Sequence, residues 1–150
     1  MKHTGFLLAR MGHVAAKQFA ARLDELGLTT RMWGALNVLD AEGALTQQAL
    51  GTCTGIDPSS MVATVDDLES AGLVERRRHP SDRRAHAIHI TEQGRETLIR
   101  GRHLAGRAQE DLLAPLDAEE RKQLHELLLR LVIATKPKGV AAGEPQTQQK

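Results

Sequence analysis

The segment ERRRHPSDRRAHAIHIT, residues 75–91, gathers five arginines around a Pro-Ser-Asp turn and then alternates between polar and apolar side chains. Alternation of this kind is typical of a β-strand. With the overlapping stretch LVERR, residues 73–77, the segment predicts a β-hairpin with a polar, basic tip. Residues 75–84 hold five arginines and two acids, a local charge of +3, whereas the whole chain has a net charge of +1. The location of this charge, rather than its total, points to a nucleic-acid partner.

The two segments before the hairpin predict helices joined by a very short turn. TQQALGTCT begins at Thr46, a good N-cap residue, and Gly55 ends it. DPSSMVATVDDLESAG, residues 57–72, starts with an N-cap aspartate, Asp57, and with Pro58 at the first helical position. About three residues separate the two helices, which is typical of a helix-turn-helix motif.

Longer helices flank this motif. Apolar residues at helical spacing predict four of them, over about residues 4–26, 28–43, 92–114 and 116–134. In the last of these, Asp117 with Glu120 three residues later resembles a capping box. That helix is apolar around much of its circumference, which predicts that a second chain covers it. The remaining residues, 136–150, are rich in Gly, Pro and Gln and predict a disordered tail.

The composition excludes several classes of protein. Hydrophobic residues make up 41% of the chain but aromatic residues only 2%, so we expect an aliphatic core of packed helices. The single cysteine excludes an internal disulfide. The absence of an apolar run of roughly 18 residues and of a signal-peptide pattern predicts a cytoplasmic protein. Because no catalytic triad context, phosphate-binding glycine loop or metal cluster stands out, we expect neither an enzyme nor a bound cofactor.

Two stretches resemble the MarR (multiple antibiotic resistance regulator) family of winged helix-turn-helix transcription factors. DRRAHAIHITEQG, residues 82–94, is similar to the family's wing signature of Asp-x-Arg, a β-strand and Leu-Thr-x-x-Gly, with Ile90 in place of the usual leucine. DPSSMVATVDDLESAGLVERR, residues 57–77, resembles the recognition helix and the first wing strand. The resemblance covers about residues 5–135. It implies a mainly α fold of six helices with a small β-hairpin wing, in which a winged helix-turn-helix DNA-binding lobe joins a helical dimerisation region.

The same resemblance implies a division of the chain and a function. Residues 1–28 and 92–135 would form the dimerisation region, residues 29–91 the DNA-binding lobe and residues 136–150 the tail. The implied function is that of a homodimeric, sequence-specific transcriptional regulator, most often a repressor. Its partners would be a pseudo-palindromic double-stranded DNA operator and a small aromatic or phenolic effector that releases it.

The implied DNA contacts lie on the recognition helix and on the wing. A helix in the major groove reads base edges, and a basic wing reaches the neighbouring minor groove. By the resemblance, Arg84 enters that minor groove and Asp82 holds it in place by a salt bridge. The complete set of candidate DNA-binding residues is Ser59, Ser60, Val62, Ala63, Arg76, Arg77, Arg78, Asp82, Arg83 and Arg84.

The predicted recognition helix departs from the family pattern in its charge. Family members often carry an arginine or lysine on the exposed face, but none occurs from Asp57 to Gly72. This excludes a bidentate arginine–guanine contact from the helix and leaves serine hydroxyls and methyl groups to contact bases. Asp66 and Asp67 would repel phosphates unless they pair with nearby arginines. We therefore expect more of the affinity to come from the wing than is usual.

Effectors in the family bind in a cleft lined by the first, second and fifth helices. His13, Arg31 and Trp33 are candidate ligand-binding residues, because a polar or cationic group beside an aromatic ring suits a small aromatic acid. The alternative is that Trp33 belongs to the core and His13 to the surface or to a subunit interface.

Two residue types suggest other kinds of sensing. Cys53 lies on the apolar side of its short helix, so we expect a small buried residue rather than a redox switch. His86 and His89 fall on opposite faces of a strand and no two histidines stand four residues apart, so we expect no metal site. A redox- or metal-responsive regulator is nevertheless an alternative, and it is tested by whether an oxidant or a chelator alters DNA binding. A second alternative is a ligand-independent, architectural dimer that binds DNA with little sequence preference, which the arginine-free recognition helix favours.

Overall fold

The computed structural model describes residues 3–81, 84 and 86–135, and these fall into two compact units. The first unit ends at Leu112 and the second begins at Leu113. The predicted tail and two of the predicted wing residues, Asp82 and Arg83, lie outside the described residues.

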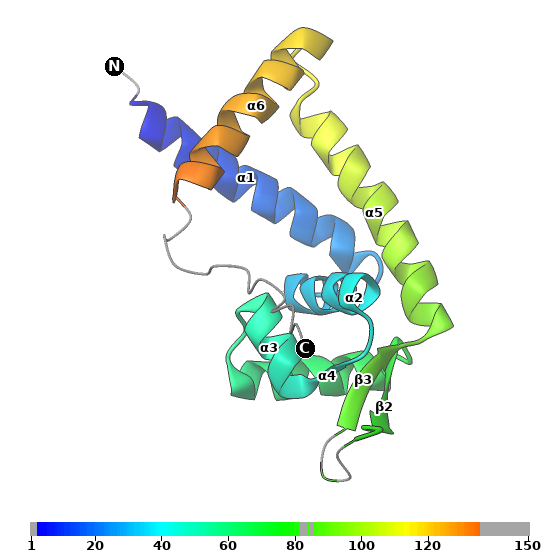
Figure 1. Ribbon diagram of the computed structural model, residues 1–150. Coiled ribbons are helices and arrows are strands. Elements are labelled where there is room, and N and C mark those ends of the chain that lie inside the picture. Colours follow the sequence, from blue (N-terminus) through cyan, green and yellow to red (C-terminus); the bar gives the residue numbers. More distant parts are fainter. Residues whose placement is uncertain (1–2, 82–83, 85, 136–150) are drawn as a thin grey trace, which may run out of the picture. The chain divides into compact units, whose positions relative to one another are not determined.

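Helices dominate the first unit, and the hairpin of β2 and β3 follows its fourth helix (Figure 1). The elements of this unit are α1 (Thr4–Asp24), α2 (Thr30–Glu42), β1 (Leu45–Thr46), α3 (Gln47–Thr54), α4 (Pro58–Ser70), β2 (Val74–Arg78), β3 (His86–Ile90) and α5 (Glu92–Leu112). The second unit holds α6 (Ala118–Thr135). The predicted mainly α fold of six helices with a hairpin wing is therefore confirmed.

Local hydrogen bonds explain where the helices begin. The hydroxyls of Thr29 and Thr46 accept hydrogen bonds from backbone N–H groups one turn later, each at 3.2 Å, and so cap α2 and α3. Gly55 ends α3 in the left-handed conformation, with φ of 70°. Only three residues, 55–57, join α3 to α4. The predicted helix-turn-helix arrangement is confirmed.

The wing strands belong to a three-stranded antiparallel sheet of order β1-β3-β2. β2 and β3 pair along their whole lengths, with Val74 opposite Ile90, which confirms the predicted hairpin. β1 adds a pairing of Leu45 with Ile88 on the other edge of β3. The sequence pattern predicts only the hairpin, because a strand of two residues carries no periodicity.

An aliphatic core lies between α2, α4 and the sheet and extends to α1, α3 and α5. Its largest fully buried leucines come from all five helices of the unit and are Leu23, Leu36, Leu39, Leu50, Leu68 and Leu98. Complete burial of a side chain of this size stabilises the fold by about 1.5–3 kcal/mol. The expected aliphatic core is confirmed, and it fixes the helix-turn-helix motif against the sheet.

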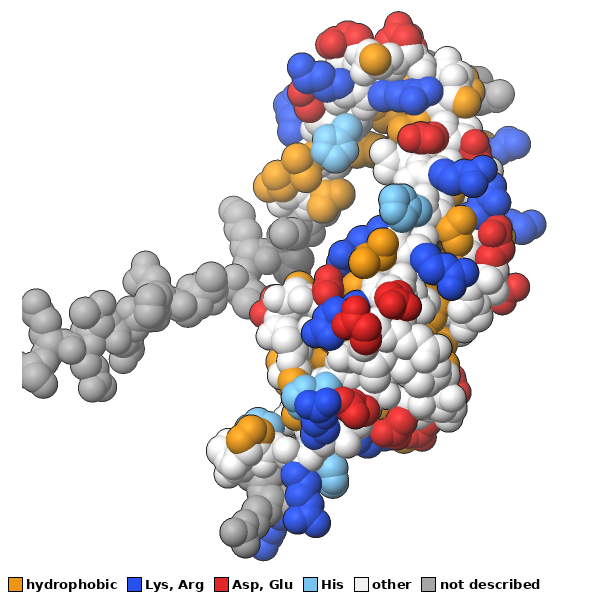
Figure 2. Space-filling model, turned by 90° about the vertical axis from the view of Figure 1, so that its right-hand side faces the viewer, with side chains coloured by type: hydrophobic (Ala, Val, Ile, Leu, Met, Phe, Trp, Pro, Cys, Tyr) orange, Lys and Arg blue, Asp and Glu red, His pale blue; other side chains and the backbone are white. Residues whose placement is uncertain are grey.

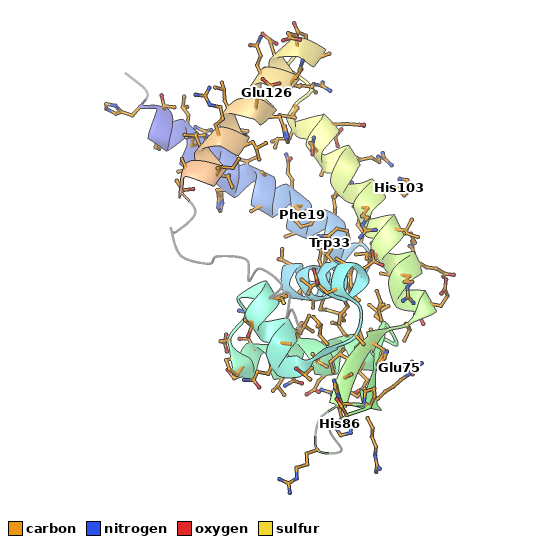
Figure 3. The ribbon with its side chains drawn as sticks, in the orientation of Figure 1. Phe19, Trp33, Glu75, His86, His103 and Glu126 are labelled. Carbon is orange, nitrogen blue, oxygen red and sulfur yellow. The ribbon has the colours of Figure 1, made fainter. Side chains whose placement is uncertain are left out.

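Close contacts hold α5 to α2 and to the wing. A Cβ atom added to Gly101 of α5 would meet Trp33 Cζ3 at 2.1 Å, so the indole ring lies directly on the helix backbone. Trp33 also packs edge-on against Phe19 of α1, with ring centroids 5.8 Å apart (Figure 3). At the start of α5, the Thr91 hydroxyl donates to the carbonyl oxygen of Gly72 at 2.7 Å. The helix is therefore tied to the turn that precedes β2.

The second unit begins with the predicted capping box. The Asp117 carboxylate accepts from the Glu120 N–H, and the Glu120 carboxylate accepts from the Asp117 N–H, both at 2.9 Å. α6 has no buried residue. Its exposed large apolar side chains are Leu127, Leu128, Leu129, Leu131, Val132 and Ile133. Among the described helices, none combines the length and the apolar character that crossing a membrane requires.

Candidate nucleic-acid interface

α4 is the second helix of the helix-turn-helix, the position from which such motifs insert a helix into the major groove. Its inner side packs on the core through Met61, Thr64, Val65 and Leu68. Its outer side exposes Ser59, Val62, Ala63, Asp66 and Asp67, with Ser60 half-buried beside them. Val62 is 44% exposed, a high fraction for an apolar side chain. The outer side thus offers hydroxyl, methyl and carboxylate groups to a partner.

Asp57 organises the first turn of α4. Its carboxylate accepts from the Ser60 N–H at 2.9 Å and from the Ser59 hydroxyl at 2.7 Å. These hydrogen bonds, first from Ser60 and then from Ser59, hold the pKa of Asp57 well below its usual range. The carboxylate therefore stays ionised, and it engages the Ser59 hydroxyl within the protein.

The wing carries exposed cations. Arg77 and Arg78 of β2 are exposed, as is Arg84. Figure 2 shows Lys, Arg and His side chains gathered at the lower end of its face. Arg77 pairs with Glu75 on the same strand, whereas Arg78 makes no ion pair within the part of the chain that the structure describes. The implied salt bridge from Asp82 to Arg84 involves a residue outside the described ones and stays a prediction.

Basic side chains line a hollow on the outer part of the hairpin, next to its tip. The lining residues are Ala44, Arg77, Arg78, His79, Pro80, Ser81, Ala87 and His89. The Ser81 N–H donates to His79 Nδ1 at 3.3 Å, which orients the imidazole ring. Two arginines and two histidines around one hollow are suited to a phosphate group.

Arg76 differs from the other wing arginines because it is tied to α4. Its guanidinium contacts Asp66 at 2.5 Å and also pairs with Glu69, so that it bridges two carboxylates one turn apart. Its side chain is only 26% exposed. Partial burial disfavours the charged form, but the hydrogen bonds to Asp66 and Glu69 outweigh it and raise the pKa of Arg76. Asp66 therefore pairs with a nearby arginine, which the sequence analysis left open.

The three candidate ligand-binding residues have different surroundings in the structure. Trp33 is half-buried against Phe19 and Gly101. Arg31 is exposed and lines a shallow hollow between α2 and α3, whose other lining residues are Thr30, Gly34, Val38, Thr54 and Ile56. His13 is exposed on α1 and does not line that hollow. The contacts of Trp33 agree with the alternative that it is a core residue.

The structure bears on the expectations about Cys53 and about a metal site. The expectation that Cys53 is buried is wrong, because the thiol is exposed. The short helix α3 buries only Leu50, and the side turned to the core continues to the half-buried Thr54 rather than to Cys53. Within the described residues, His, Cys, Asp and Glu side chains form no group of three or more that is arranged to hold a metal ion.

Sequence reasoning did not single out Glu69 for the interface. Its carboxylate also accepts from the backbone N–H of Arg76 at 3.2 Å, so it anchors both the side chain and the backbone of β2. A signal was present in the sequence, since a turn with an arginine-rich strand follows an acidic helix end. Only the fold shows which acid meets which arginine.

Comparison with protein families gives a match to the MarR family over residues 26–85. A protein of Thauera aromatica described as a candidate transcriptional regulatory protein for the hcr operon is 37% identical over 128 residues. This match spans 85% of the present chain and 77% of the Thauera protein.

Solved structures of transcriptional regulators are also similar to this chain. A probable transcriptional regulator from Pseudomonas aeruginosa is 32% identical, with a TM-score of 0.71, over 87% of this chain and 97% of that one. A MarR family protein of Mycobacterium tuberculosis in complex with DNA is 27% identical, with a TM-score of 0.75, over 87% of this chain and 98% of that one. The same mycobacterial protein has also been solved with salicylic acid and with p-aminosalicylic acid.

Proposed function

Because the chain belongs to the MarR family of DNA-binding transcriptional regulators, we propose that it is a homodimeric repressor of a pseudo-palindromic operator. Each protomer places α4 in the major groove and its wing in the adjacent minor groove. The observation that carries this proposal is the juxtaposition of α4, with its small exposed side chains, and the arginine-rich strand β2 in one lobe. The DNA complex of the mycobacterial relative supports it.

The proposed contacts divide into two kinds. On α4, Ser59, Ser60, Val62 and Ala63 face base edges and discriminate among them by hydroxyl and methyl contacts. On the wing, the proposed contacts to the DNA backbone and minor groove are Arg77, Arg78, Arg83 and Arg84, with Asp82 orienting Arg84. Phosphate contacts set register and affinity without reading sequence, so the four α4 residues carry the direct readout.

Dimerisation is proposed to use residues 1–28 and 92–135, around the DNA-binding lobe of residues 29–91. Two sets of exposed apolar side chains support it. α1 exposes Phe6, Leu7, Leu8 and Met11, and α6 exposes a longer run that includes Val132 at 55%. Exposed apolar surface of this extent on two separate helices is typical of a protein–protein interface, and a second copy of the chain is the proposed partner.

The proposed effector is a small aromatic acid. The complexes of the mycobacterial relative with salicylic acid and p-aminosalicylic acid support this class. Arg31 supplies an exposed cation for a carboxylate, and His13 and Trp33 remain the other proposed ligand residues. Salicylate should lower operator affinity in the wild type and less so in Arg31→Ala. His13→Ala is tested beside it, and Lys17→Ala, also on α1, serves as the control.

The decisive experiment is a titration of the purified protein against the promoter region beside its own gene. It is carried out with scrambled competitor DNA at two salt concentrations. Binding that survives the competitor and gives a footprint with dyad symmetry supports the sequence-specific repressor. Binding that disappears with competitor or modest salt indicates contacts mainly to phosphate.

The second candidate function is a ligand-independent dimer that binds DNA with little sequence preference. The observation that favours it is the absence of lysine and arginine from α4. It predicts equal affinity for specific and scrambled duplexes, which the same titration measures.

A further inference from the structure

Arg76 lies on the face of β2 that is turned toward the core and α4. Its partner across the hairpin is Ile88, which is 1% exposed, and side chains of paired residues share one face of a sheet. The neighbouring Arg77 has the opposite orientation and a side chain that is 61% exposed, against 26% for Arg76. The two adjacent arginines are therefore in different environments, although the sequence presents them as one basic run.

The guanidinium of Arg76 is occupied on two sides. One terminal nitrogen contacts Asp66 and the other pairs with Glu69. The Glu69 carboxylate also accepts the backbone N–H of Arg76. To form a two-point contact with a phosphate through its terminal nitrogens, the guanidinium would have to give up contacts to these carboxylates. That exchange would gain a phosphate contact but weaken two ion pairs, and it would leave negative charge uncompensated beside the DNA.

The charge of α4 makes this exchange costly. The segment from Asp57 to Ser70 contains four acids and no lysine or arginine. Asp66 lies on the outer side of α4 at helical spacing from Val62, the side that would approach DNA, and it is 56% exposed. An unpaired carboxylate there would repel the phosphates of a bound duplex.

We propose that Arg76 is a positioning residue rather than a DNA contact. It neutralises Asp66 and Glu69 and fixes β2 against α4, so that the recognition helix and the wing enter their grooves as one rigid element. This inference rests on the proposed DNA-binding function. It removes Arg76 from the set of groove contacts and adds Asp66 and Glu69 to the residues that determine operator affinity.

The test is a mutant cycle on the full-length protein. The four proteins are the wild type, Arg76→Gln, the double variant Asp66→Asn/Glu69→Gln, and the triple variant that combines all three changes. Asparagine and glutamine keep the hydrogen-bonding oxygen but remove the charge. The probe is a duplex selected by the wild type from a random-sequence library. Affinity is measured at several salt concentrations, and thermal unfolding is recorded for each protein.

Arg76→Gln should weaken binding by about tenfold or more, because it leaves two carboxylates unpaired at the interface. The triple variant should return to within about threefold of the wild type, because no unpaired carboxylate is left at the interface and the amide side chains can still hydrogen-bond β2 to α4. Its salt dependence should match that of the wild type. Neutralising the two acids should therefore improve binding much more in the Arg76→Gln background than in the wild type.

A direct contact would give a different result. If neutralisation of the acids improved binding equally in both backgrounds, and the triple variant lost about one unit of salt slope, Arg76 would be a phosphate ligand and the inference would be wrong. The control is Arg78→Gln, which should lose that slope unit and gain nothing extra from the double substitution. If Arg76→Gln does not fold, the comparison of the double and triple variants decides, because neither retains the two acids: a phosphate contact by Arg76 predicts a loss of about one unit of salt slope in the triple variant, and a positioning role predicts none.

The experiment distinguishes a failure of this inference from a failure of the proposed function. If the wild type selects no duplex above random DNA, the proposed function fails. If it selects a duplex but the triple variant is not rescued, only the role of Arg76 fails.

Discussion

The contact between Gly101 and Trp33 makes a quantitative prediction about stability. In Gly101→Ala the new methyl group would lie 2.1 Å from Trp33 Cζ3, far inside van der Waals contact. The ring cannot move freely, because it also packs against Phe19. Overpacking of this kind costs about 1–3 kcal/mol. The substitution also gains about 0.8–1.0 kcal/mol from the higher helix propensity of alanine. The net change is therefore between nearly neutral and destabilising by about 2 kcal/mol.

The matched control is Gly106→Ala on the same helix. An added Cβ at Gly106 meets nothing within 4 Å. This variant should show only the propensity gain and be stabilised by about 0.8–1.0 kcal/mol. The difference between the two variants then equals the overpacking cost alone, about 1–3 kcal/mol. For a domain of this size it corresponds to a gap of roughly 2–12 °C in Tm.

Thermal unfolding followed by circular dichroism measures this gap. Because Trp33 is the only tryptophan, its emission spectrum reports the displacement of the ring directly. In a Trp33→Phe background the smaller ring should relieve the clash, so Gly101→Ala should become less destabilising or even stabilising. Equal Tm values for the two glycine variants, together with an unchanged emission spectrum, would refute the close approach of α5 to α2.

Three further predictions concern the wing, the dimer and the helix cap. Arg84→Ala should weaken operator binding by about tenfold at physiological salt, and Arg78→Ala should lower the salt slope by about 1, both measured by titration. If the proposed dimer uses α6, Val132→Glu should give a monomer in light scattering, because it places a charge in an apolar interface, whereas Gln123→Glu on the same helix should not. The stabilisation that Asp57 provides is complete above the ordinary pKa of aspartate, about 3.9, and is lost as the pH falls toward its lowered folded pKa. The Tm advantage of the wild type over Asp57→Asn should therefore shrink between pH 6 and pH 3; a constant difference would contradict the lowered pKa.

Helix starts were predictable because their signals are local. Thr29, Thr46, Asp57 and Asp117 each stand at the N-cap of a helix, and each forms the expected hydrogen bond within one turn. A cap depends on residues that are adjacent in the chain, so the sequence contains all the information that specifies it.

Features that depend on distant partners were not predictable in this way. β1 exists only because Leu45 meets Ile88, a residue from a strand much later in the chain. The contact of Gly101 with Trp33 likewise joins two helices that are far apart in the sequence. Cys53 was misplaced for a related reason. Its apolar neighbours on a single short helix do not show which side of that helix meets the core.

The ion pairs of the candidate interface also join residues that the sequence alone does not pair. They indicate where the affinity for DNA should concentrate. Counted along the sequence, the wing has an excess of arginine and α4 an excess of acid. In the fold, Arg76 is committed to Asp66 and Glu69, and Arg77 pairs with Glu75. The pairs of Arg76 offset the two excesses against each other, so α4 repels DNA less than its composition suggests and the base of the wing attracts it less. The attraction that remains lies further along the hairpin, from Arg78 toward the tip. This distribution is compatible with the proposed sequence-specific regulator, because the cations proposed to contact phosphate are separate from Arg76, which pairs with two acids of α4.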